Sequence, residues 1–126
     1  PFSSDANATD VGDLVTQRMF LAGGQSSADN GYTSGGLYAF GYNPTDVIDK
    51  FPFSSDANAT DVGDLTQARG YSSGTSSSSS GYAAGGVVPP NTGVDIIDKF
   101  PFSSDANATD VGDLLEAKAS TSGTQG

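Results

Sequence analysis

The stretch PFSSDANATDVGDL at residues 1–14 returns unchanged at residues 52–65 and again at residues 101–114. These three copies, here called the recurrent phrase, start at residues 1, 52 and 101, so they are spaced 51 and 49 residues apart. Repeats of this length are typical of one supersecondary unit that is copied and stacked, because a single unit cannot bury its own apolar face. The sequence therefore predicts units that shield one another rather than one globular core.

The chain divides after each copy of the recurrent phrase. Residues 1–14 are then the tail of one unit, 15–65 and 66–114 are two complete units, and 115–126 are the front of a further unit. Because the two complete units match each other outside the phrase as well, we expect them to share one internal structure.

Composition limits both the core and the partners of the protein. Hydrophobic residues make up 35% of the 126 residues and cysteine is absent, so burial within a unit is modest and no disulfide joins the units. The 15 acidic and 5 basic residues give a net charge of -10, which repels nucleic acid and anionic membrane surfaces. No apolar run reaches the roughly 18 residues of a membrane span. We expect a soluble protein that neither binds nucleic acid nor inserts into a membrane.

Each complete unit is predicted to hold four short β-strands between glycine, serine and asparagine turns. In the second unit these strands lie at residues 70–75, 81–88, 94–102 and 111–114. The strand at 94–102 has the strongest pattern, since its apolar and polar side chains alternate. The serine tract at 76–80 has no means of burying itself and is predicted to be an exposed loop.

A helix over residues 10–20 is the alternative for the end of the recurrent phrase. Val11, Leu14, Val15 and Met19 have helical spacing. Gly12 lies inside this segment, however, and a mid-helix glycine costs about 1 kcal/mol relative to alanine. We therefore favour a strand, with the helix as the second interpretation.

The order of signals in each unit resembles the kelch repeat. An arginine is followed by a Gly-Tyr-x-x-Gly-Gly block at 31–36 or 81–86, and then by an apolar-acidic-lysine-aromatic strand at 47–53 or 94–102. The resemblance implies an all-β fold of kelch-like β-propeller blades, each about 50 residues long. The chain would supply two complete units plus two half units of a ring that is incomplete, since closure typically takes four to eight blades. One departure is the tryptophan of the family, which this chain lacks.

The longer stretch IDKFPFSSDANATDVGDLTQAR, at residues 48–69, resembles repeats in predicted virion structural proteins of marine phages, especially cyanophages. This resemblance implies a virion surface or extracellular location, in a tail fibre, an adhesin or another appendage. It also implies as partners other copies or further repeats of the same protein, virion subunits, and a glycan or protein on the host surface.

The inventory of reactive side chains restricts catalysis. Histidine and cysteine are both absent, which excludes Ser-His and Cys-His nucleophilic devices and the usual zinc sites. Pairs of carboxylates remain in each phrase, such as Asp61 with Asp64, and they are the acid and base that a glycosidase needs. An active site rarely recurs in every repeat, so we assign these aspartates to turns and loop caps. We predict no catalytic residue, no cofactor and no enzyme activity.

The same phrase offers oxygen atoms at alternating positions, as calcium prefers. An EF-hand is not met, because the sixth and twelfth positions counted from Asp5 hold Asp10 and Thr16 instead of Gly and Glu. Hydrogen-bonded Asx turns are the favoured interpretation and bound calcium is the alternative. The candidate calcium ligands are Asp5, Asn7, Asp13, Asp56, Asn58, Asp64, Asp105, Asn107 and Asp113.

Each phrase also carries an Asn-Ala-Thr sequence that fits an N-glycosylation site. Modification is expected in a secreted eukaryotic protein, whereas under the phage interpretation the pattern is incidental. The acceptor asparagines are Asn7, Asn58 and Asn107, all in a predicted exposed turn.

We interpret the chain as a non-enzymatic structural or adhesive module that presents variable loops on a rigid scaffold with few interior charges. The tyrosines and phenylalanines of the strands are expected to pack between units rather than to form a glycan platform. Ligand recognition is expected in the loops at 25–30 and 76–80, where the units differ. The alternatives are a secreted tandem-repeat fibre, glycosylated or calcium-stabilised, and a carbohydrate-active enzyme.

Overall fold

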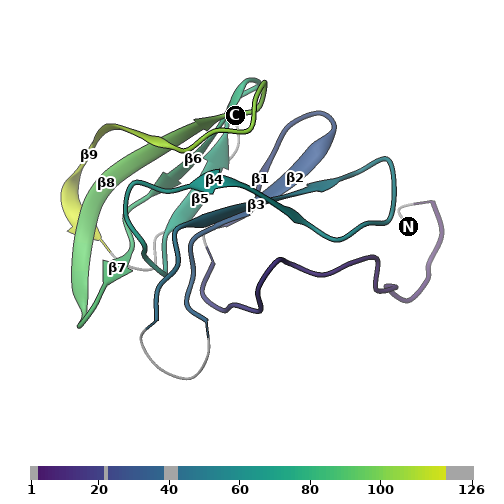
Figure 1. Cartoon of the computed structure of the whole chain (residues 1–126), viewed down its shortest axis with the longest axis horizontal. Helices are drawn as coiled ribbons and strands as arrows, with labels where there is room; N and C mark the ends of the chain where they lie inside the picture. Colours follow the sequence, from purple (N-terminus) through teal and green to yellow (C-terminus); the bar gives the residue numbers. More distant parts are fainter. Residues whose placement is uncertain (1–2, 22, 39–42, 119–126) are drawn as a thin grey trace.

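The computed structural model describes residues 3–21, 23–38 and 43–118. This part of the chain is all β, with nine strands and no helix (Figure 1). Its strands form two antiparallel sheets, one from each complete unit, and the two sheets do not close on each other. None of the described residues belongs to a helix that could cross a membrane.

The first sheet is a meander in which each strand pairs with the next along the chain. Its strands are β1 (Gln25–Ser26), β2 (Asn30–Ser34), β3 (Val47–Pro52) and β4 (Thr60–Asp64). The second sheet has the order β5-β6-β8-β7, with β9 paired to β8. Its strands are β5 (Ser73–Ser76), β6 (Ser80–Ala84), β7 (Val87–Val88), β8 (Thr92–Pro101) and β9 (Thr109–Lys118).

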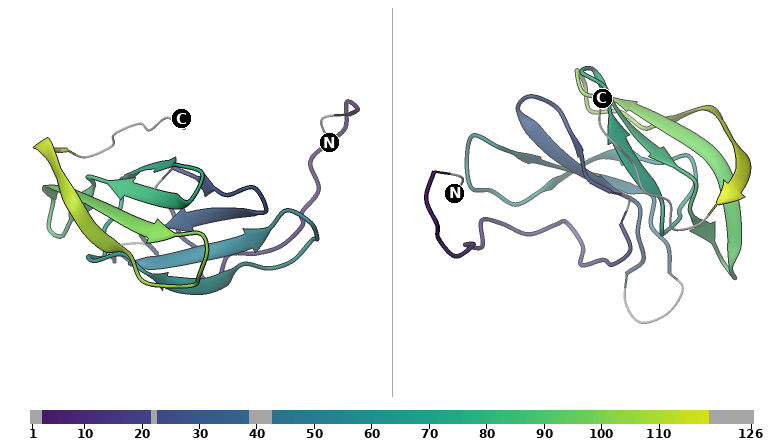
Figure 2. Two further views of the ribbon diagram at one scale, coloured as in Figure 1. Left: turned by 90° about the horizontal axis from the view of Figure 1, so that it is seen from above. Right: turned by 180° about the vertical axis from the view of Figure 1, so that it is seen from behind.

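The two sheets have the same register at equivalent positions. Tyr32 lies opposite Lys50 in the β2–β3 pair, and Tyr82 lies opposite Lys99 in the β6–β8 pair. The sheets lie side by side, and the segment before β1 runs away from β9 (Figure 2). Equivalent strands therefore present equivalent side chains in one common direction along the row of units.

The four strand positions predicted for each unit are confirmed in outline. The predicted strand at 81–88 divides into β6 and β7, because Gly85 and Gly86 adopt positive φ angles of 65° and 110° between them. The alternative helix over residues 10–20 is wrong. None of these residues is helical, and Gly12 has a φ of 154° that a helix does not accommodate.

The serine tract at 76–80 is only partly the exposed loop that the sequence predicts. Ser76 and Ser80 lie in strands and are 6% and 5% exposed, while Ser78 and Ser79 are exposed at the turn. The hydroxyl of Ser77 accepts hydrogen bonds from the backbone N–H groups of Ser79 and Ser80, which closes a tight hairpin. A serine tract thus supplies its own turn, and its ends join the sheet.

Candidate functional site

The candidate site is the contact between the two sheets, here called the junction. It begins at the outer edge, where one copy of the recurrent phrase lies on the next. The N–H of Asp64 donates to Oδ1 of Asn107 at 3.1 Å, and the N–H of Ala108 donates to the carbonyl oxygen of Asp64 at 2.8 Å. The asparagine of the phrase therefore binds the preceding unit, in addition to any role in its own turn.

The same pair of bonds occurs one copy earlier in the chain. The N–H of Asp13 donates to Oδ1 of Asn58 at 3.0 Å, and the N–H of Ala59 donates to the carbonyl oxygen of Asp13 at 2.8 Å. Two identical contacts between consecutive copies show that the phrase is complementary to itself. An unchanged copy therefore fits both the copy before it and the copy after it.

A glycine makes this close approach possible. A Cβ at Gly63 would collide with the carbonyl oxygen of Ala106, and a Cβ at Gly12 would collide with that of Ala57. Gly112 is the equivalent residue of the third copy, and a Cβ there would meet no atom of the described part of the chain within 4 Å. All three have nearly the same φ, of 154° or 155°, so they differ in their neighbours and not in their backbone.

This difference yields a prediction with an internal control. We expect Gly63→Ala to lower the free energy of unfolding clearly more than Gly112→Ala, because both carry the same backbone strain but only Gly63 meets another unit. Urea denaturation of the two variants, at protein concentrations low enough to keep them monomeric, measures the difference. Equal losses would mean that the phrases do not press against each other in solution.

The middle of the junction is an apolar cluster built from both sheets. Tyr32 of β2 is 3% exposed and stacks on Phe102 with the ring centroids 4.8 Å apart. It also meets Phe100 of β8 at 5.6 Å, beside the buried side chains of Ile48 and Leu65. The expected packing of aromatic rings between units is thus found for this tyrosine and these phenylalanines.

A second ring contact lies between the segments that lead into the two sheets. Phe20 and Tyr71 occupy equivalent positions and stack with centroids 4.3 Å apart. Both have positive φ angles, of 53° and 59°, and the N–H of Tyr71 donates to the carbonyl oxygen of Phe20 at 2.9 Å. Such a backbone is uncommon for a bulky residue, so its occurrence in both units indicates that the stacking requires it.

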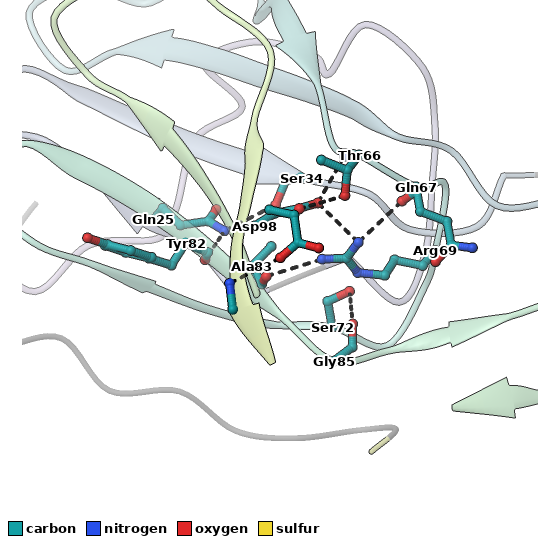
Figure 3. A network of polar contacts seen from close by, with 12 residues as sticks. Gln25, Ser34, Thr66, Gln67, Arg69, Ser72, Tyr82, Ala83, Gly85 and Asp98 are labelled. Atoms are coloured by element: carbon teal, nitrogen blue, oxygen red, sulfur yellow. Dashed lines mark hydrogen bonds and ion pairs between the residues drawn. The ribbon is translucent and has the colours of Figure 1, made fainter. Parts of the chain in front are cut away.

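An ion pair lies buried in each unit, which corrects the expectation of a scaffold with few interior charges. Arg69 and Asp98 have side chains that are both 0% exposed, and Nη1 of Arg69 donates to Oδ2 of Asp98 at 3.1 Å (Figure 3). In the first unit Arg18 makes the equivalent pair with Asp49. The sequence contained a signal for this ion pair, because an arginine before the first strand and an aspartate in the third strand recur in both units.

The carboxylate of Asp98 also holds the chain where it crosses from one sheet to the other. It accepts hydrogen bonds from the N–H and the hydroxyl of Thr66, at 2.9 and 2.6 Å. Arg69 donates in addition to the carbonyl oxygen of Ala83 at 3.1 Å. The network therefore fixes the segment that follows β4 against β6 and β8 of the next unit (Figure 3).

Polar contacts also cross the junction directly. Nε2 of Gln25, which is 2% exposed, donates to the hydroxyl of Ser34 in its own sheet at 3.1 Å and to the carbonyl oxygen of Tyr82 in the next sheet at 2.9 Å. At the opposite edge Nζ of Lys50 pairs with Asp105 at 2.6 Å. The junction thus spans the whole width of the sheets.

One titratable group at the junction predicts a dependence of stability on pH. Burial, followed by the charges of Asp46 and Asp61, raises the pKa of Asp64. The folded state therefore holds this proton more tightly than the unfolded chain does, and the free energy of unfolding falls as pH rises between the unfolded and the folded pKa.

We expect Asp64→Asn to stabilise the protein at pH 7, by less than about 1 kcal/mol. The asparagine keeps the backbone bonds to Asn107 and Ala108 and removes only the charge. Below about pH 3 the aspartate is protonated in both states, so the advantage should disappear. Urea denaturation at the two pH values tests this, and a variant that is less stable at pH 7 would refute it.

Three of the nine candidate calcium ligands use their side chains in other contacts. Oδ1 of Asn58 and of Asn107 accept from the preceding unit, and Asp105 pairs with Lys50. Among the described residues no three His, Cys, Asp or Glu side chains gather into a group that could hold a metal ion. The glycosylation acceptors Asn7, Asn58 and Asn107 are exposed.

The first carboxylate of each pair considered for catalysis caps a turn. Oδ1 of Asp10, Asp61 and Asp110 each accepts the N–H of the glycine two residues later, at 3.1 Å. This confirms the Asx turns that the sequence predicts for the phrase.

The two loops in which ligand recognition was expected have the same conformation. Ser27 accepts from the N–H groups of Asp29 and Asn30 just as Ser77 does in the second unit. The units differ more in sequence in the connection after the glycine pair, at 37–46 and 87–95, where the sequence predicts a turn only between the strands at 81–88 and 94–102. Residues 39–42 of the first connection lie outside the described residues.

Comparison of the sequence with models of known protein families gives no match, and comparison with curated proteins gives none either. Function is therefore inferred from the junction and from the surfaces beside it.

Proposed function

We propose that the protein is a non-enzymatic structural and adhesive module of a virion surface, in which each sheet is a blade of a kelch-like β-propeller. The observation that carries this proposal is the self-complementary phrase, whose consecutive copies make the same two backbone bonds. A phrase of this kind serves to extend an assembly, because every copy offers a surface for the next one.

The use of side chains in the phrase supports a structural function over an enzymatic one. Asp61 caps the turn at Gly63, and Asp64 docks on Asn107 through its backbone. The carboxylate of Asp98 is held by Arg69 and Thr66 of the same chain, while Nε of Arg69 is buried without a partner among the described residues. The charged and polar groups of the phrase and of the ion pair are thus used to hold turns, units and the contact between units. The net charge of -10 keeps the surface soluble and opposes unspecific adhesion to anionic cells.

Electron microscopy with an antibody against the protein tests the proposed location. Gold label on the appendages of cyanophage particles is the expected result, and fluorescently labelled protein should bind host cells but not resistant cells. Label on filaments free of particles would favour the second candidate, a secreted fibre, for which the three exposed acceptor asparagines are the supporting observation. Hydrolysis of a glycan that is lost in Asp61→Asn and Asp64→Asn would instead reveal an enzyme.

A further inference from the structure

The two outer faces of the row of units each carry one half of a junction. On one face Tyr82 and Ile97, the equivalents of Tyr32 and Ile48, are half-buried. Their counterparts inside the junction are 3% and 0% exposed. This face, together with Gly112, is here called the tyrosine face. The ring of Tyr82 is equivalent to the ring of Tyr32, which packs on the next unit inside the junction. Among the described residues, no other unit covers the ring of Tyr82.

The opposite face carries a groove that lacks such a ring. It encloses about 310 Å³ and is lined in part by Val11, Leu14, Thr33, Phe51 and Ala59. These are the equivalents of five residues that surround Tyr32 and Ile48 in the junction: Val62, Leu65, Ala83, Phe100 and Ala108. We call this the groove face. The exposed Phe53 beside it corresponds to Phe102, on which Tyr32 stacks.

The edge of the tyrosine face is open in the same way. A Cβ at Gly63 would meet the backbone of Ala106 in the next copy of the phrase, whereas a Cβ at Gly112 would have none of the described residues within 4 Å. The turn that would fit there has the sequence Asp-Ala-Asn-Ala, which each molecule carries at residues 56–59. The missing half of each face is therefore present on the other end of the same chain.

We propose that a second copy of this chain docks end to end, with the tyrosine face of one molecule on the groove face of the next, in the geometry of the internal junction. Tyr82 then enters the groove beside Phe51 and Phe53, and the N–H of Asp113 donates to Asn58 of the second molecule. The two faces differ, so the contact is head to tail, and further copies can add until a ring closes or a filament grows. This assembly does not depend on where the protein is displayed.

The contact requires one segment to move. Residues 11–14 and residues 111–114 of β9 are equivalent parts of the recurrent phrase. In the proposed geometry, β9 of the first molecule therefore needs the place that residues 11–14 of the second molecule now occupy. β9 is paired along β8, whereas residues 3–14 form no strand and Val11 is 52% exposed. Residues 3–14 of the second molecule therefore yield, while Arg18 keeps its pair with Asp49. Val111 and Leu114 of the first molecule then take the places of Val11 and Leu14 in the groove, and the bonds from Asp13 to Asn58 are replaced by those from Asp113.

Analytical ultracentrifugation over a range of concentrations tests the proposal on the full chain. We expect association that Tyr82→Ala weakens at least about tenfold, which is the effect of losing a buried aromatic anchor. Gly112→Val should have a similar effect because its side chain blocks the approach of Ala57. Gly12→Val should instead strengthen association, since it loosens the segment that competes for the same place.

A mixing experiment checks the head-to-tail direction. Phe53→Lys damages only the groove face, at a residue that is 56% exposed, and Tyr82→Ala damages only the tyrosine face. At a concentration where the weakened association leaves each variant alone monomeric, an equimolar mixture should form dimers and nothing larger. Circular dichroism and thermal unfolding confirm that each variant is folded as the wild type is.

Three outcomes would overturn the proposal. They are a wild-type protein that stays monomeric at every concentration, association that Tyr82→Ala leaves unchanged in a folded protein, and a Gly12→Val variant that associates no better than the wild type. Larger species in the equimolar mixture would likewise exclude the head-to-tail contact, because each variant keeps only one working face.

Discussion

Replacement of Arg69 by methionine is expected to lower the free energy of unfolding by about 3–5 kcal/mol. Arg69 and Asp98 are both fully buried, and the substitution leaves the carboxylate of Asp98 with Thr66 but without a balancing charge. This cost is a large share of the 5–15 kcal/mol that typically separates folded from unfolded chains, so the variant is expected to be marginal. Urea denaturation followed by circular dichroism measures the loss.

Two variants control this experiment. Lys50→Met breaks an ion pair whose side chains are 27% and 60% exposed, and it should cost no more than about 1 kcal/mol. The double variant Arg69→Met with Asp98→Leu removes both charges and should lose less than the single variant does. If Arg69→Met were as mild as Lys50→Met, the buried pair would not hold the crossing chain.

Replacement of Tyr32 by alanine should cost about 3–5 kcal/mol, as for other buried aromatic residues. The ring is 3% exposed and stacks on Phe102 across the junction, so its loss opens a cavity between the sheets. Thermal and urea unfolding of monomeric protein measure the change in stability.

Tyr82→Ala is the matched control, since it removes the same residue from the same register position of the second sheet. Tyr82 is half-buried, and its ring makes no contact with another ring among the described residues, so we expect less than half the loss. Equal losses from the two variants would show that tyrosine supports its own sheet rather than the neighbouring one.

Much of the fold follows from the repetition of the phrase. The spacing of its copies predicts two equal units, and the alternation in 94–102 predicts β8. The ends of the strands were less predictable where a residue type that is typical of loops belongs to a strand. Serine is typical of loops, yet Ser76 and Ser80 are buried in strands because the hydroxyl of Ser77 closes the turn between them.

The junction could be predicted only in principle. An asparagine in a polar turn can accept a bond from its own backbone or from a distant segment, and the sequence does not distinguish these. Asn107 in fact accepts from Asp64, 43 residues earlier. Aspartates in strands are usually solvated. The burial of Asp98 could therefore be predicted only from the arginine that recurs with this aspartate in both units.

Hydrogen exchange of the Tyr32→Ala variant, read by mass spectrometry, tests most directly whether the two sheets stabilise each other. The substitution lies in β2, and the account predicts that amide protection falls in β8 of the other sheet as well as in β2 and β3. Loss of protection confined to the first sheet, with β8 as protected as in the wild type, would contradict it.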